Sequence, residues 1–114
     1  MTLMERAYDA LSCAGVDVRL ATRHSGVCDA PYCVIYEGQP EIAGKTLTRR
    51  HILVDALVPA ARPQSLQGLC GDIRTALQIG PGLTFAGASS DCALEDYRAV
   101  GRTMDFTALC GTDI

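Results

Sequence analysis

The stretch that decides the fold is RRHILVDALVP at residues 49–59, which leads within a few residues into RPQSLQGLCGDIRTALQIG at residues 62–80. In the first segment, apolar side chains alternate along the chain. One side holds Ile52, Val54, Ala56 and Val58. The other side also holds Leu53 and Leu57 beside polar residues. This period of two predicts a long strand that is covered, at least in part, on both faces.

The second segment predicts an amphipathic helix. Its apolar stripe follows helical spacing and consists of Leu66, Leu69, Cys70, Ile73 and Leu77. Pro63 suits the first helical position, and Gly80 with Pro81 ends the pattern. Gly68 and Gly71 weaken the helix, so we interpret them as sites of close packing against the sheet.

A second helix is predicted at the start of the chain. Thr2 and Glu5 form a capping box, and Gly15 supplies a left-handed stop. Residues 16–20 then alternate as a strand with Val16, Val18 and Leu20 inward.

The remaining segments complete an α-β-β-β-α-β-β order. We expect strands at residues 32–38, 83–87 and 96–110, the last with its core face beginning near Met104. Residues 39–48 are expected to form a loop or hairpin tip, and residues 88–95 a turn. Short connections between adjacent strands favour antiparallel pairing. The predicted fold is therefore an α+β two-layer sandwich, with a mostly antiparallel sheet and two helices on one face.

Bulk properties narrow the functional class. A length of 114 residues fits a single domain, 1–114. The formal net charge of −3 argues against nucleic-acid binding, which usually needs a basic surface. No apolar run is long enough to cross a membrane, and the acidic residues near the start do not fit a signal peptide. We therefore expect a protein made in the cytoplasm, whose six cysteines are reduced and mostly structural.

Three loop residues, His24, Cys28 and Cys33, carry the one candidate metal site. Zinc prefers such ligands but needs three or four of them to converge. A fourth ligand would have to come from elsewhere in the chain, and His51 and Cys92 are candidates. Because the spacing lacks a paired Cys-x-x-Cys, a small thiol- or zinc-binding protein is the alternative hypothesis and not the first one.

Other catalytic and cofactor signals are weak. A cysteine next to a histidine could act as a nucleophile, but the sequence brings no such pair together. Phosphate-binding glycine loops are absent. The acidic group Asp91, Glu95 and Asp96 lacks the spacing of a calcium loop. The sequence thus predicts no enzyme activity and no cofactor.

Four stretches together resemble the tail terminator and tail completion proteins of long-tailed bacteriophages. They are the helix-to-strand start of the chain, PYCVIY at 31–36, RHILVDALV at 50–58 leading to a helix that ends IRTAL at 73–77, and the final strand from 97 to 109. These stretches cover most of the chain. Their similarity to the family is one of residue-type pattern and not of a strict sequence signature. The high cysteine content and the loop around Pro40 and Gly44 depart from the family.

The resemblance implies a non-enzymatic α+β subunit of a phage or prophage. Such a subunit assembles into a ring, often a hexamer, at the end of the tail tube and meets tail-tube and head–tail connector proteins. It would occur in the host bacterial cytoplasm during assembly and then in the virion tail. The basic group Lys45, Arg49 and Arg50 at the 39–48 loop could pair with acids of a neighbouring copy. The predicted subunit interface consists of Glu41, Lys45, Arg49, Arg50, Asp91, Glu95 and Asp96.

Overall fold

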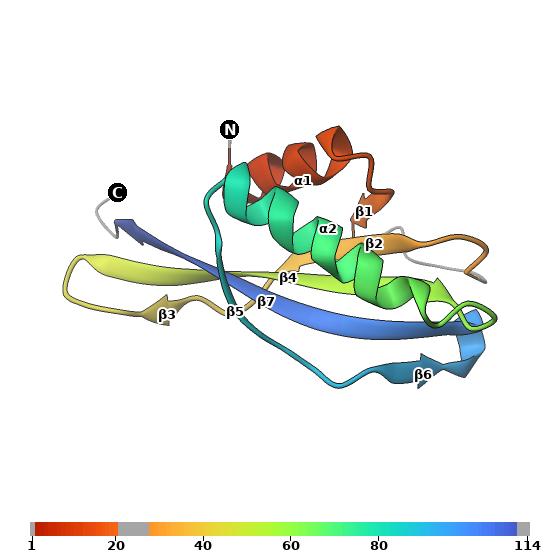
Figure 1. Cartoon of the computed structure of the whole chain (residues 1–114). Coiled ribbons are helices and arrows are strands. Elements are labelled where there is room, and N and C mark those ends of the chain that lie inside the picture. Colours follow the sequence, from red (N-terminus) through yellow and green to blue (C-terminus); the bar gives the residue numbers. More distant parts are fainter. Residues whose placement is uncertain (1, 21–27, 112–114) are drawn as a thin grey trace.

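The computed structural model describes residues 2–20 and 28–111 and has an α+β fold (Figure 1). In chain order the elements are α1 (Leu3–Cys13), β1 (Val18–Leu20), β2 (Tyr32–Glu37), β3 (Glu41–Ile42), β4 (Leu47–Pro59), α2 (Ser65–Ile79), β5 (Thr84–Ala88), β6 (Cys92–Leu94), the short 3₁₀ helix η2 (Glu95–Tyr97) and β7 (Ala99–Gly111). The predicted order of the main elements is confirmed, and the structure adds β3 and β6 within segments expected to be a loop and a turn.

The sheet is built around β4 and β7. These two antiparallel strands pair along their whole length, from Leu47 opposite Gly111 to Pro59 opposite Ala99. The strand order is β1-β2-β4-β7-β5, with β3 also paired to β4 and β6 to β7. Only the β1–β2 pair of these described strands is parallel, so the sheet is mostly antiparallel as predicted.

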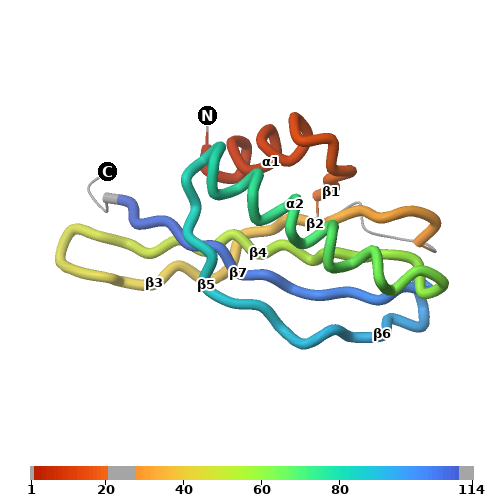
Figure 2. Tube along the Cα trace, in the orientation of Figure 1, coloured from red at the N-terminus to blue at the C-terminus, as the bar shows by residue number. Residues whose placement is uncertain are grey.

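Both helices cover the same face of the sheet, as the sequence predicts (Figures 1 and 2). The stripe of α2 is buried at Leu66, Cys70, Ile73 and Leu77. It joins a core with Ile52, Val54, Ala56 and Val58 of β4 and Met104 and Phe106 of β7. The match between helical and strand periods is thus confirmed in three dimensions.

The predicted ends of α1 are also confirmed. The Thr2 hydroxyl accepts a hydrogen bond from the Glu5 amide at 3.1 Å. Gly15 follows the helix with a φ of +82°, a left-handed conformation that a residue without a Cβ adopts at little cost. Capping at both ends leaves the apolar face of Leu3, Ala7 and Leu11 directed into the core.

Several details of the sequence interpretation are wrong. Leu20 is 39% exposed because β1 is a three-residue strand at the edge of the sheet, with no further strand beside it in the described chain. Pro63 precedes the helix, which starts at Ser65 after a turn closed by Ser65 N–H donating to Arg62 O. Gly68 and Gly71 lie on the exposed side of α2, and a Cβ at either would meet nothing within 4 Å.

The face of the sheet opposite the helices, here called the open face, has a smaller apolar cluster. Its buried members are Cys28, Tyr32, Val34, Leu57 and Ala99. Beyond this cluster, toward the turn between β3 and β4, half-buried polar side chains of β2, β4 and β7 occupy the open face. No described helix covers it (Figure 1).

Candidate functional site

The segment 38–47, here called the hairpin arm, extends past the helix layer at one end of the molecule (Figure 1). It contains β3, which pairs with β4 through Glu41 opposite Arg49 and Ile42 opposite Thr48. Ile42 is 89% exposed, and Leu47 and Leu109 nearby are also exposed. The arm therefore places apolar side chains in solvent at the end of a long sheet.

The predicted basic residues gather at the arm but differ in their partners. Arg50 donates to Glu37 Oε1 at 2.8 Å. Lys45 and Arg49 are exposed and have no ion pair among residues 2–20 and 28–111. The cations available to an external partner are thus Lys45 and Arg49.

The predicted acidic residues lie at the other end, near β6 and η2 (Figure 1). Asp91 accepts from Arg102 Nε at 2.7 Å, and this hydrogen bond lowers the pKa of the Asp91 carboxyl. Glu95 and Asp96 are exposed on η2 without an ion pair inside the described chain. The molecule is 48 Å long and about half as wide, so the two charged groups cannot meet within one copy.

Glu41, the remaining predicted interface residue, contacts His51. The His51 ring lies on the open face, with Nδ1 at 2.8 Å and 3.1 Å from the two carboxylate oxygens of Asp105. Its Nε2 contacts Oε1 of Glu41 on β3. Hydrogen bonds to Asp105 first and Glu41 second raise the pKa of His51 above its ordinary value.

A second polar group follows on the same face. The Tyr36 hydroxyl donates to Asp55 Oδ1 at 3.0 Å, and the Thr103 hydroxyl donates to the same oxygen at 2.7 Å. Burial, together with the Asp55 charge, raises the pKa of Tyr36 to about 12. These bonds tie β2, β4 and β7 together on the open face of the sheet.

The proposed zinc ligands do not converge where the structure describes them. Cys33 faces the helices and is fully buried, and burial raises its thiol pKa to about 12. Cys28 packs in the open-face cluster, where its Sγ donates to Ala30 O at 3.3 Å. His24 lies outside the described residues. Among the described residues, no three His, Cys, Asp or Glu side chains are grouped to hold a metal ion.

The other cysteines are also free thiols. Cys70 is buried in the helix-facing core, as expected for a small apolar residue, while Cys110 is half-buried. Cys13 and Cys92 are exposed. In the described part of the chain, both nitrogens of His51 already contact carboxylates, so the ring has no free position to activate a thiol.

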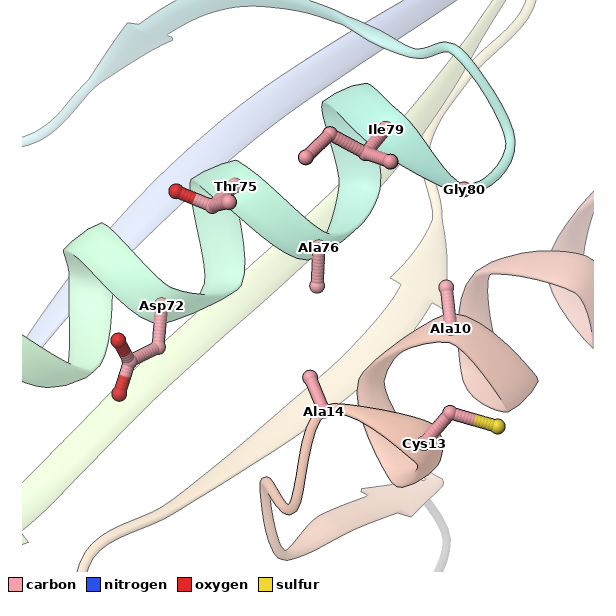
Figure 3. Close-up of a pocket in the computed structure, with 8 residues that line it drawn as sticks. All are labelled: Ala10, Cys13, Ala14, Asp72, Thr75, Ala76, Ile79 and Gly80. Atoms are coloured by element: carbon pink, nitrogen blue, oxygen red, sulfur yellow. The ribbon is translucent and has the colours of Figure 1, made fainter.

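A shallow groove of about 490 Å³ runs between α1 and α2 (Figure 3). Small side chains such as Ala10, Ala14 and Ala76 line it, with Cys13, Asp72, Thr75 and Ile79 around them. Gly80 closes one end, where an added Cβ would lie 2.8 Å from Ala10 Cβ. The side chains of the groove offer one carboxylate, one hydroxyl and one thiol, and its other lining residues are apolar or glycine.

Sequence reasoning missed both polar groups on the open face. His51 and Asp105 are separated by 54 residues and become neighbours only through the β4–β7 register. The alternation of each strand predicted their faces, but a pattern within one strand does not fix its offset against another. The same holds for Asp55 and Thr103, which are directly opposite in that register.

Comparison with protein-family models and with curated protein sequences found no match to this chain. Among the described residues, no helix is long and apolar enough to cross a membrane. The function is therefore inferred from the resemblance in residue pattern together with the arrangement of the residues themselves.

Proposed function

We propose that this chain is a non-catalytic structural subunit of a bacteriophage or prophage tail. It caps or completes the tail tube and joins it to the head by assembling into a ring, often a hexamer in the family that it resembles. Its partners would be further copies of itself, tail-tube protein and head–tail connector proteins. It would be made in the host bacterial cytoplasm and end in the virion tail.

The observation that carries the proposal is the separation of unpaired charge between the two ends. Lys45 and Arg49 lie at the hairpin arm, and Glu95 and Asp96 lie at the far end of a molecule 48 Å long. A surface at one end that complements a surface at the other makes a head-to-tail contact. Repeated head-to-tail contacts close into a ring when the rotation between copies divides a full turn.

Not every predicted interface residue is equally suited to this contact. Arg50, Asp91 and Glu41 already have partners inside the chain, namely Glu37, Arg102 and His51. They would have to exchange those partners to bind a neighbour. Lys45 and Arg49 would instead pair with Glu95 and Asp96 without breaking any ion pair within the described chain. Arg98 follows directly after η2, and its positive charge partly cancels the negative charge of Glu95 and Asp96. A neighbouring copy would therefore recognise these two acids by close contact and not by long-range attraction.

Ion pairs of this kind orient the subunits more than they hold them together. Exposed pairs contribute only about 0.2–1 kcal/mol each. Burial of Ile42, Leu47 and Leu109 contributes more to the free energy of association, since apolar area removed from water stabilises by about 25 cal/mol per Å². Because such ion pairs are individually weak, assembly would need high concentration or the tail-tube end as a template.

The absence of catalysis is part of the proposal. Support comes from His51, whose two nitrogens face carboxylates, and from the buried thiols of Cys28 and Cys33 on opposite faces of the sheet. The raised pKa of the Cys33 thiol opposes formation of a reactive thiolate.

The test is a pair of charge reversals. Lys45→Glu with Arg49→Glu, or Glu95→Lys with Asp96→Lys, should each shift the oligomer toward monomer in sedimentation velocity at several protein concentrations. Mixing the two double variants should restore mixed oligomers, because each then complements the other. The same variants would be scored for tail completion in a phage assembly assay.

Asp9→Lys with Asp72→Lys is the matched control. It makes the same charge change as the acidic reversal, but at exposed positions of the helix layer, and should leave assembly intact. A wild-type chain that stays monomeric with and without tail-tube protein would overturn the proposal. So would reversed variants that assemble as the wild type does.

A further inference from the structure

One histidine connects the hairpin arm to the body of the sheet. His51 on β4 lies between Asp105 on β7 and Glu41 on β3, the short strand of the arm. The His51 side chain is 16% exposed, whereas the carboxylates of Asp105 and Glu41 are 33% and 55% exposed. The ring is therefore held inside the structure, and Glu41 is the more accessible of its two partners.

The chemistry of imidazole makes this arrangement depend on a proton. A neutral ring carries one N–H and can donate to one carboxylate, while its other nitrogen presents a lone pair. A protonated ring carries two N–H groups and can donate to both. Contacts to carboxylates at both nitrogens are thus satisfied together only in the imidazolium form.

Loss of the proton should release Glu41 and not Asp105. Both oxygens of Asp105 approach Nδ1, and its strand β7 is paired along its whole length to β4. Glu41 offers one oxygen from a strand of two residues. Apart from that strand pairing, two backbone hydrogen bonds hold the arm within the described residues. At its base Gly38 N–H donates to His51 O at 3.0 Å, and near its tip Ala43 N–H donates to Leu47 O at 3.0 Å.

We propose that His51 is a proton-operated latch for the hairpin arm. When the ring is protonated, Glu41 is tied to the open face and the arm is held in line with β4. When the ring is neutral, the tie to Glu41 is lost and β3 separates from the sheet more often.

The surroundings of His51 favour the charged ring. From β3 it faces Glu41, and from β7 it faces Asp105. From its own strand the cation Arg49 lies on the same face, opposite Glu41 in register, and opposes protonation. Gly38, the residue directly after β2, also lies beside His51: a Cβ there would be 3.1 Å from His51 Cβ, and glycine brings no charge to the ring.

The direction of the pH effect follows from these charges. Because the pKa of His51 in the folded chain is raised above 6.5, the latch is closed below pH 6.5. It opens as the pH rises through the raised value. If the proposed ring function holds, the arm is presented in a fixed position for assembly at the lower pH. The latch itself does not depend on that function.

The experiment measures the arm in the dilute monomer by NMR. The chain has two histidines, so His24→Gln leaves a single imidazole signal whose titration gives the His51 midpoint. In the same samples, solvent exchange of the Ala43 amide is measured by magnetisation transfer from water and divided by its intrinsic rate at each pH. We expect protection of this amide to fall roughly two- to fivefold across the His51 midpoint, the factor for an exposed ion pair.

Glu41→Gln should abolish this step, and His51→Gln should make Ala43 protection independent of pH over the same range. Glu37→Gln is the matched control, because Glu37 pairs with Arg50 and belongs to the neighbouring strand β2. That variant should keep the step. Protection that stays flat across the His51 midpoint, or a step that persists in Glu41→Gln, would overturn the latch. A step seen in a chain that never assembles would uphold the latch and reject the ring.

Discussion

Substitution of Gly80 by alanine should destabilise the protein, although glycine to alanine changes near a helix usually stabilise it. An ideal Cβ at position 80 would lie 2.8 Å from Ala10 Cβ and 3.0 Å from Ala76 O, one atom on each helix. Overpacking of this kind costs about 1–3 kcal/mol. Alanine also lowers the conformational entropy of the unfolded chain, and this effect stabilises the folded protein by about 0.4–1 kcal/mol. The net loss should therefore lie between about 0 and 2.6 kcal/mol, with a middle value of about 1.3 kcal/mol.

The controls for this prediction lie on the same helix. Gly68 and Gly71 are exposed, and a Cβ at either meets nothing within 4 Å. Their alanine variants should gain up to about 1 kcal/mol each from helix propensity alone. All three free energies of unfolding would be measured by urea denaturation with a common slope. If Gly80→Ala proved as stable as Gly68→Ala, the close approach of α1 to the end of α2 would be refuted.

Three further predictions concern the core, the open face and the thiols. Ile73→Ala should cost about 2–5 kcal/mol in denaturant melts, because Ile73 is fully buried between α2 and the sheet; a loss below about 0.5 kcal/mol would contradict that burial. In an ultraviolet titration Tyr36 should ionise near its pKa of about 12, and Tyr36→Phe should remove that step. Because this folded pKa is raised, the stability that it contributes is fully present below pH 10, the ordinary tyrosine value, and is lost as the pH rises through about 12. In brief alkylation followed by mass spectrometry, Cys13 and Cys92 should label in the native protein and Cys28, Cys33 and Cys70 only after unfolding; rapid native labelling of Cys33 would refute its burial.

The layered fold could be predicted because its signals are local. The alternation of β4 and the helical stripe of α2 each lie within one segment, and together they indicate which face of the sheet meets the helices. The capping residues Thr2 and Gly15 likewise act within a few positions of themselves. The predictions from sequence were wrong where contacts with distant parts of the chain determine burial or strand pairing. Leu20 alternates correctly but lies on a strand at the edge of the sheet, and β3 and β6 form only because β4 and β7 extend far enough to pair with them.

The candidate site could be predicted only in part, for the same physical reason. The charged residues of the interface are visible in the sequence, but their partners are not. Nothing in the order of residues shows that Arg50 is taken by Glu37 while Arg49 is left without an ion pair in the described chain. The His24, Cys28 and Cys33 group looked close in sequence, yet the step from Cys28 to Cys33 crosses from one face of the sheet to the other.

The two faces of the sheet differ in what a substitution on them would change. The helix-facing core is almost entirely apolar and closely packed, so a change there acts first on stability. The open face links four strands through hydroxyl, imidazole and carboxylate groups that are partly exposed, from 16% for the His51 side chain to 55% for that of Glu41. Such groups can gain or lose a proton, or bind a partner, while the core stays packed. Any regulation of the hairpin arm should therefore act through the open face, and variants there should alter assembly or its pH dependence before they alter the fold.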